Sequence, residues 1–420
     1  MNSLKIKTSD FVNWTILILY RICLDYIYVD YLVDRWWYMG FIIKVDGLSY
    51  LLSWIVFAFM IGFINQNLRK HDPSSFIMVL LNLIAFIPAT TMLGLYPQDN
   101  YFALLITLFW LALNCMYNII PKFRIVRTKN KESNLLFKLV IVFFIISVWI
   151  ISYRYTGLRI NLNLLNVYDL REEAMGFEMP TLITYIISAA RIIIPTAMIY
   201  YLDKKRYLLF SFLLLTGILV FSINGQRSVL FTILLAIGGF FFYKNNILIY
   251  VPSIFLGVSI LSIIEYKISS LSYIIDIFIR RVLFLPQLLN YYYYDFFSKN
   301  SFDYFRQGLL SGLGVESPYD ENISIMIGNL YLGGNTNNGL FSDAYANFGF
   351  FGMILMPLLI VLALKVLDSV SKGIDNRLLI ACIIMLTMNF LSSSFFIVML
   401  THGFIAVCIL LYLIPRETKV

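Results

Sequence analysis

The sequence predicts an all-α, polytopic membrane protein with about twelve transmembrane helices. Hydrophobic residues form 60% of the 420-residue chain, charged residues form 13%, and the mean hydropathy is +0.80. A soluble chain of this length needs more polar surface to cover its core. Apolar runs recur throughout, and a helix of about twenty residues crosses a hydrocarbon core of about 30 Å. These runs lack the alternation of barrel strands, so helices are expected.

The apolar runs follow one another along most of the chain. The expected spans are approximately residues 11–30, 47–65, 74–94, 101–120, 135–153, 179–202, 207–223, 228–243, 247–264, 340–364, 378–395 and 397–414. No repeat, linker or soluble domain separates them, so residues 1–420 are expected to form a single membrane domain. The first run contains Arg21 and Asp25 and lacks a small-residue cleavage site, so we do not expect a removable signal peptide.

The distribution of lysine and arginine predicts the orientation. With a cytoplasmic N-terminus, eighteen of the 32 basic residues fall in cytoplasmic connections and eleven fall on the outer face. The positive-inside bias therefore predicts cytoplasmic termini, with outer loops at about residues 154–178 and 265–339. The net charge of +8 is expected to face membrane lipid rather than nucleic acid.

The outer basic residues are mainly arginines, with eight Arg and three Lys, whereas the cytoplasmic set has six Arg and twelve Lys. Guanidinium groups hold phosphate or carboxylate through paired hydrogen bonds, so the bias favours an outer anion site. Structural pairing with Asp and Glu is the alternative. The candidate pyrophosphate-binding residues on this face are Arg159, Arg227, Arg280 and Arg281.

Two arginines have distinctive positions. Arg227 follows an Asn-Gly turn in SINGQRSVLF, where the start of the next helix adds positive potential. Arg191 lies about a dozen residues inside a span, where a charge costs about 3 kcal/mol and usually faces a cavity or an acidic partner. We consider Arg191 a fifth pyrophosphate-binding candidate, with an ion pair to a residue such as Asp25 as the alternative.

The second outer loop carries candidate sugar-binding residues. It opens with an amphipathic segment, interrupted by Arg280 and Arg281, that is expected to lie on the membrane surface. Tyrosines of the following NYYYYDFF segment could stack on sugars or form an interfacial aromatic belt. Asparagines of the Gly-rich run could bind hydroxyls or only shape a turn. The sugar-binding candidates are Tyr292, Tyr293, Asn335, Asn337 and Asn338.

Two residues are candidate catalytic bases. Asp343 lies where the large outer loop enters the tenth span, and His402 lies near the outer end of the last span. A helix cap is the alternative role of Asp343, and packing against a backbone carbonyl is that of His402. The loop carboxylates Asp169 and Glu173 are further options. Phosphate-loop, HExxH, CxxC, GxSxG and Asp-x-Asp motifs are all missing, so we expect neither metal nor cofactor.

Two segments together resemble the Wzy-type O-antigen polymerases, the bacterial oligosaccharide repeat-unit polymerases. They are NGQRSVLF between two spans and GNTNNGLFSDAYANFGFFG entering a span after a long outer loop. The resemblance implies a GT-C-like fold, an undecaprenyl-pyrophosphate-linked oligosaccharide as substrate, and a chain-length regulator protein as partner. Some members carry an R-x10-G pattern in outer loops. Arg227 and Gly238 share that spacing by chance, since Gly238 lies inside a span.

The family implies transfer of the growing chain from its pyrophosphate onto the non-reducing end of a fresh lipid-linked unit. An O-antigen ligase, which uses a lipid A core acceptor, is the nearest alternative. A lipid-linked oligosaccharide flippase is a third hypothesis. Transporters usually show two matching halves, but the two halves of this sequence do not match.

Overall fold

The computed structural model describes residues 8–126, 130–161, 167–243 and 247–416, and these residues form helices without a strand. Within them, eight helices are long and apolar enough to cross a membrane, and three apolar helices are shorter. The predicted all-helical, polytopic architecture is confirmed. The eight long helices fall short of the twelve expected spans, so the number of spans stays a prediction.

The helices occur in the order that the apolar runs predict. They are α1 (Thr8–Ile27), α2 (Val33–Trp36), α3 (Gly47–Leu68), α4 (Pro73–Leu81), α5 (Ile87–Leu95), α6 (Asn100–Ile119), α7 (Asn130–Thr156), α8 (Val167–Met175), α9 (Thr181–Asp203), α10 (Tyr207–Asn224), α11 (Arg227–Phe242), α12 (Ile247–Ser269), α13 (Leu285–Phe297), α14 (Ile323–Tyr331), α15 (Phe341–Ser371), α16 (Ile380–Ser392) and α17 (Phe404–Leu413). Wider π-helical turns join α1 to α2, join α4 to α5 and precede α13 and α17.

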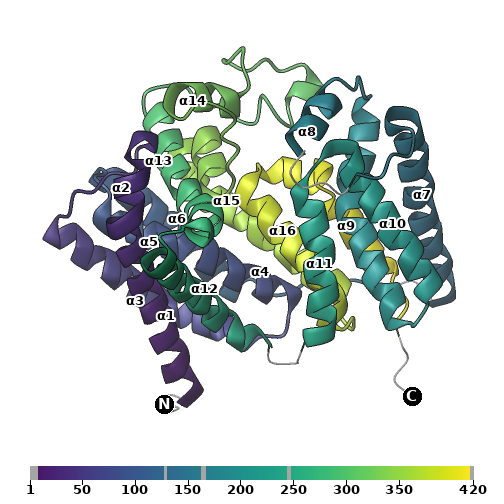
Figure 1. Cartoon of the computed structure of the whole chain (residues 1–420), viewed down its shortest axis with the longest axis horizontal. Coiled ribbons are helices and arrows are strands. Elements are labelled where there is room, and N and C mark those ends of the chain that lie inside the picture. The colour runs from purple at the N-terminus through teal and green to yellow at the C-terminus, as the bar shows by residue number, and fades with distance from the viewer. Residues whose placement is uncertain (1–7, 127–129, 162–166, 244–246, 417–420) are drawn as a thin grey trace.

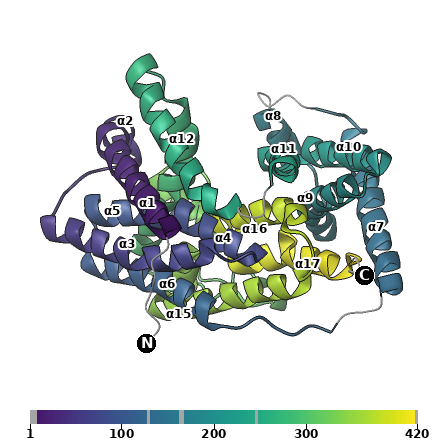
Figure 2. The same cartoon turned by 90° about the horizontal axis from the view of Figure 1, so that it is seen from below.

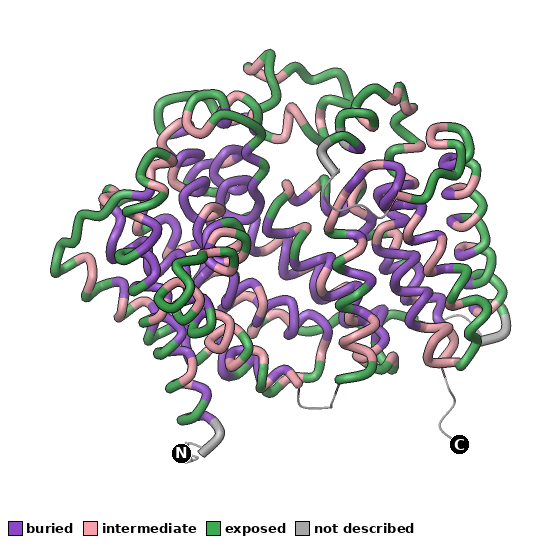
Figure 3. The backbone as a smooth tube through the Cα atoms, in the orientation of Figure 1, coloured by how far each residue is buried: buried purple, intermediate pink, exposed green. Residues whose placement is uncertain are grey.

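The helices form two groups (Figures 1 and 2). One group contains α1 to α6, α12, α13 and α15, and the other contains α7 to α11. Helices α16 and α17 lie between them, because α16 packs on α4, α9 and α11, and α17 packs on α9 and α15. Of the eight long apolar helices, the span from Pro73 to Leu95 is the most buried, and α3 and α12 are the least buried (Figure 3).

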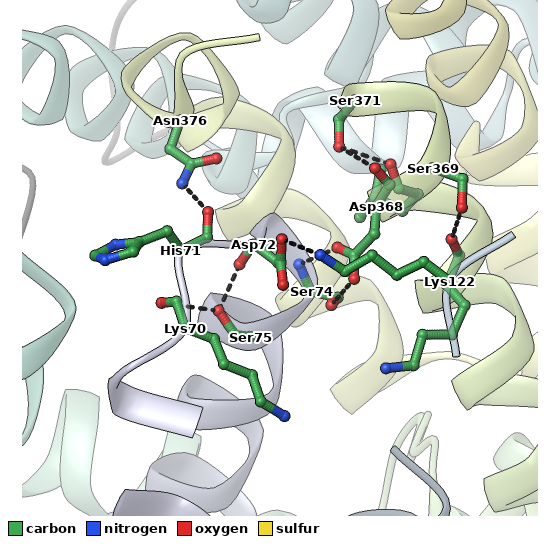
Figure 4. A network of polar contacts seen from close by, with 12 residues as sticks. Lys70, His71, Asp72, Ser74, Ser75, Lys122, Asp368, Ser369, Ser371 and Asn376 are labelled. Atoms are coloured by element: carbon green, nitrogen blue, oxygen red, sulfur yellow. Dashed lines mark hydrogen bonds and ion pairs between the residues drawn. The ribbon is translucent and has the colours of Figure 1, made fainter. Parts of the chain in front are cut away.

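Connections that the lysine bias assigns to the cytoplasm meet on one face. Lys122 forms an ion pair with Asp72 at 2.5 Å, and the side chain of Asn376 donates to the carbonyl of His71 (Figure 4). Arg377 reaches across to Asp203 at 2.6 Å. Connections far apart in the sequence are therefore on the same side of the bundle, as their basic residues predict.

The same face contains a buried polar contact between α4 and α15. The carboxylate of Asp368 accepts hydrogen bonds from the backbone N–H of Ser74 at 3.0 Å and from its hydroxyl at 2.6 Å (Figure 4). The Ser74 hydroxyl also lies 2.8 Å from the Tyr117 hydroxyl. Because Asp368 is only 4% exposed, these donors satisfy a carboxylate that burial would otherwise destabilise.

The described parts of the two long loops lie on the opposite face, where Figure 1 shows α8 and α14 at the top of the view. The expected surface segment is a continuous helix from Ile275 into α13, and α13 packs on α15 with most of its residues buried. This segment is therefore packed into the bundle.

The late helices are broken where they approach the outer face. Helix α15 contains a kink at Gly349, which has φ +52°, and a Cβ atom there would lie 2.4 Å from the Phe302 ring. The chain breaks again at Ser393 and at Gly403, where φ is +79° and Ala189 approaches closely. Glycine permits both the positive φ and the close approach. Irregular backbone in a membrane protein is tolerated where it is packed in protein or lines a cavity.

Candidate functional site

A cavity of about 320 Å³ lies between the large outer loop and the broken ends of α15 and α16. It brings together five residues that the sequence analysis selected: His402, Asp343, Asn337, Asn338 and Tyr293. We call it the polar cavity, since most of its lining side chains carry a hydroxyl, amide, carboxyl or imidazole group. Both candidate bases thus share one space with three candidate sugar-binding residues.

Asp343 is 5% exposed and joins two parts of the cavity wall. One carboxylate oxygen accepts the backbone N–H of Phe395 at 2.7 Å, and the other accepts the side-chain amide of Asn347 at 3.0 Å. Phe395 is the first helical residue after the break at Ser393. Asp343 therefore caps a distant helical segment rather than its own helix, and each of its oxygens keeps capacity for one more donor.

His402 lies at the second break and is half-buried. Its backbone N–H donates to the carbonyl of Ile397 at 2.8 Å, which closes the π-helical turn. Its Nε2 lies 2.9 Å from the hydroxyl of Ser393, and either group can donate, depending on the tautomer. The hydroxyl thus holds the ring at the cavity wall in a fixed orientation.

Asp303 is a third ionisable residue of the polar cavity, and the sequence analysis missed it. It is 2% exposed and accepts the hydroxyl of Ser317 at 2.7 Å and the backbone N–H of Gln307 at 2.9 Å. Its own N–H donates to the carbonyl of Ala346 on α15 at 2.9 Å. No motif marks Asp303, because only the path of the loop brings it to α15.

Gln307 fixes the loop that covers this cavity. Its side-chain amide donates to the carbonyls of Tyr319 at 3.2 Å and Glu321 at 2.7 Å, and its side-chain oxygen accepts the N–H of Ile323 at 2.9 Å. One side chain therefore satisfies three backbone groups of the chain that leads into α14. The loop is held over the cavity by its own polar contacts.

Helix α14 is attached to α13 through Tyr331. Its hydroxyl donates to Asp295 at 2.6 Å, and its ring stacks on Tyr292 with centroids 4.5 Å apart. Partial burial raises the pKa of Asp295, but hydrogen bonds from Lys299 and Tyr331 outweigh burial and hold the pKa below its usual value. The charged carboxylate thus anchors α14 beside the cavities.

A second cavity of about 300 Å³ adjoins the polar cavity and shares Asn337, Asn338 and Ser392 with it. We call it the amphipathic cavity. It contains the exposed side chains of Arg281 and Asn335. Its apolar wall is formed by Val282, Leu285, Leu289, Leu332, Met388 and Leu391. A guanidinium group beside an apolar wall suits a ligand that joins an anionic group to a lipid.

Two other predicted arginines have structural partners outside both cavities. The guanidinium carbon of Arg280 lies 3.6 Å from the centre of the Trp36 ring, and its Nε lies 3.7 Å from Asp276. Arg159 forms an exposed ion pair with Glu173 at 2.5 Å. Arg280 and Arg159 thus make structural contacts, which was the alternative to anion binding.

The remaining two arginines also lie outside the lining of the two cavities. Arg191 lies inside α9, and its Nε is buried without a hydrogen-bond partner in the described part of the chain. The alternative role of Arg191, an ion pair with a residue such as Asp25, does not form with Asp25, which bonds Arg21 at 2.6 Å on α1. Arg227 begins α11 directly after the Asn-Gly turn, as predicted.

The predicted sugar-binding residues divide into exposed and structural groups. Asn335 and Asn337 are exposed, and Asn337 lines both cavities. The buried amide of Asn338 donates to Pro286, Asn290 and Ser342 at 2.8–3.0 Å. The buried rings also have hydrogen-bond partners. The hydroxyl of Tyr292 donates to Met39, and that of Tyr293 donates to Thr336.

Within the described ranges, no group of three or more His, Cys, Asp or Glu side chains could hold a metal ion. Comparison of the chain with models of known families, with curated proteins and with solved structures gave no match. The functional argument therefore depends on the chain's own residues.

Proposed function

We propose that the protein is a glycosyltransferase that polymerises undecaprenyl-pyrophosphate-linked oligosaccharide repeat units at the outer face of a bacterial inner membrane. The observation that carries this proposal is the pair of adjoining cavities. One holds two carboxylates and a histidine, and the other places Arg281 beside an apolar wall. The resemblance of its two sequence segments to the Wzy-type polymerases, and hence a GT-C-like architecture, supports the same assignment.

The proposed reaction divides between the cavities. The donor pyrophosphate binds beside Arg281, and its polyprenyl chain follows the apolar wall toward the membrane. The bond between the reducing-end sugar carbon and the pyrophosphate oxygen breaks, and Arg281 stabilises the negative charge that develops on that oxygen. The acceptor hydroxyl oxygen forms the new bond to the same carbon. Undecaprenyl pyrophosphate leaves.

His402 accepts the proton of the acceptor hydroxyl in this proposal. Its imidazole lines the polar cavity and is oriented by Ser393, which is the arrangement a general base needs. Asp343 keeps the adjacent backbone in place through Phe395. The shared residues Asn337, Asn338 and Ser392 mark the boundary at which donor and acceptor would meet.

Deletion of the gene in its host tests the proposal. A polymerase mutant should carry single repeat units on its lipid core, because ligation continues without polymerisation. A core without any repeat unit would favour the ligase or the flippase instead. Complementation with the wild-type chain should restore long polymer, and His402→Ala should not.

A further inference from the structure

Beside His402, two side chains with an ionisable carboxyl group line the polar cavity, and no lysine or arginine joins them. Asp303 and Asp343 both line it, whereas neither lysine nor arginine does. We infer that this cavity selects its saccharide by charge, accepting a neutral or amino-bearing sugar and excluding sugars with a carboxylate. This inference rests on the proposed function, in which the cavity receives the acceptor sugar.

The two carboxylates are not neutralised by neighbouring cations. Neither Asp303 nor Asp343 forms an ion pair with any described residue. Arg306 is close in sequence, but its guanidinium donates to the carbonyls of Phe302 at 2.7 Å and Asp303 at 2.8 Å. The guanidinium of Arg306 is thus hydrogen-bonded to backbone carbonyls and not to the Asp303 carboxylate.

The bonds that the two carboxylates do make come from uncharged donors. Asp303 accepts a hydroxyl and a backbone N–H, and Asp343 accepts a backbone N–H and an amide. Each of these oxygens therefore has a lone pair left to accept one further hydrogen bond, for example from a hydroxyl or an ammonium group of a sugar. A hollow lined by one sign of charge attracts the opposite sign and repels its own.

The positive charge of the site lies elsewhere. Of the two cavities, Arg281 lines only the amphipathic one, and Arg191 lines neither. An acidic sugar in the polar cavity would meet two buried carboxyl groups without a compensating lysine or arginine in the lining. The anionic pyrophosphate and an acidic sugar would thus meet charges of opposite sign in two adjoining cavities.

Binding of simple glycosides to the purified full-length protein in lipid nanodiscs tests this inference. The probes are methyl glucoside, methyl 2-amino-2-deoxyglucoside and methyl glucuronide, compared by saturation-transfer NMR at neutral pH. We expect the amino and neutral glycosides to bind at least tenfold more tightly than the glucuronide. Glucuronide binding equal to that of the glucoside, or no binding of any probe, would overturn the inference.

Two matched variants locate the effect without altering a buried residue. Asn337 and Asn300 are both exposed asparagines of the large outer loop, but only Asn337 lines the polar cavity, and Asn300 lines neither cavity. Asn337→Lys should reduce the discrimination against glucuronide severalfold, and Asn300→Lys should leave it unchanged. Equal effects of the two variants would contradict selection by this cavity.

The gene deletion separates this inference from the proposed function. The purified protein could show the expected charge preference while the deletion strain still makes polymer. That result would support the inference and refute the polymerase function. Loss of polymer in the deletion strain, together with no preference among the glycosides, would support the polymerase function and refute the inference.

Discussion

The carboxylate of Asp343 accepts the backbone N–H of Phe395 at 2.7 Å and so joins two helical segments that lie about fifty residues apart in the sequence. Asp343→Ala should therefore lower stability, by about 1–2 kcal/mol for loss of a cap. Asp343→Asn retains a side-chain oxygen for the same N–H and should lose less. Thermal unfolding in detergent compares the two variants with the wild type. Equal stability of Asp343→Ala and the wild type would contradict the capping role.

His402→Ala should abolish polymer while substrate binding persists. Removal of a general base lowers a rate by about 10²–10⁴-fold. Ser393→Ala should leave a slower enzyme, because Ser393 only orients the ring. Polymer length in complemented cells and binding of lipid-linked substrate to purified protein are the two measurements. Normal polymer in His402→Ala would exclude His402 as the base and return Asp343 or Asp303 to consideration.

Arg281 and Arg280 provide a matched pair of neighbours. Arg281→Ala should abolish polymer in a normally folded protein, and Arg281→Lys should restore little, since an ammonium lacks the planar fork of guanidinium. Arg280→Ala should instead lower stability, because it removes the contact with Trp36. Arg227→Ala should retain more polymer than Arg281→Ala, since Arg227 lines neither cavity. Assays of chain length and of protein level separate these effects, and the opposite ranking would favour Arg227 as the anion site.

Reporter fusions test the orientation. Fusions after residues 170 and 300 should report the periplasm, and fusions after residues 130 and 370 should report the cytoplasm, as the lysine bias predicts. The structure groups the connections near Asp72, Lys122 and Asn376 on one face. A cytoplasmic signal at residue 300 would place the proposed site on the wrong side of the membrane.

Helix positions were predictable from the sequence because apolar runs end at charged residues. The expected spans 179–202 and 207–223 correspond to α9 (Thr181–Asp203) and α10 (Tyr207–Asn224) within two residues. Longer deviations occur where helices continue into polar sequence. Helix α7 (Asn130–Thr156) exceeds its expected range at both ends. Lys131 and Glu132 extend it at the start and Arg154 at the end, because Lys, Glu and Arg form helix well without being apolar.

The site was predictable only in part. Asp343 and His402 carry chemistry that the sequence displays, and the structure places both in one cavity. Asp303 reaches that cavity through a loop whose path depends on tertiary contacts. Arg280 and Arg281 are adjacent, yet one packs against Trp36, far away in the sequence, and the other lines a cavity. The pattern of outer arginines could not separate them, because burial depends on distant residues.

The packing of Gly403 against Ala189 joins a late segment of the chain to α9, which is synthesised much earlier. Every residue that lines the polar cavity lies between Tyr293 and His402, so its walls come from roughly the last third of the polypeptide. The ribosome adds about 5–20 residues per second, so the earlier helices are made many seconds before the cavity is complete. A chain truncated before Gly403 would contain every residue that lines the polar cavity but would lack α17, which packs on α9 and α15.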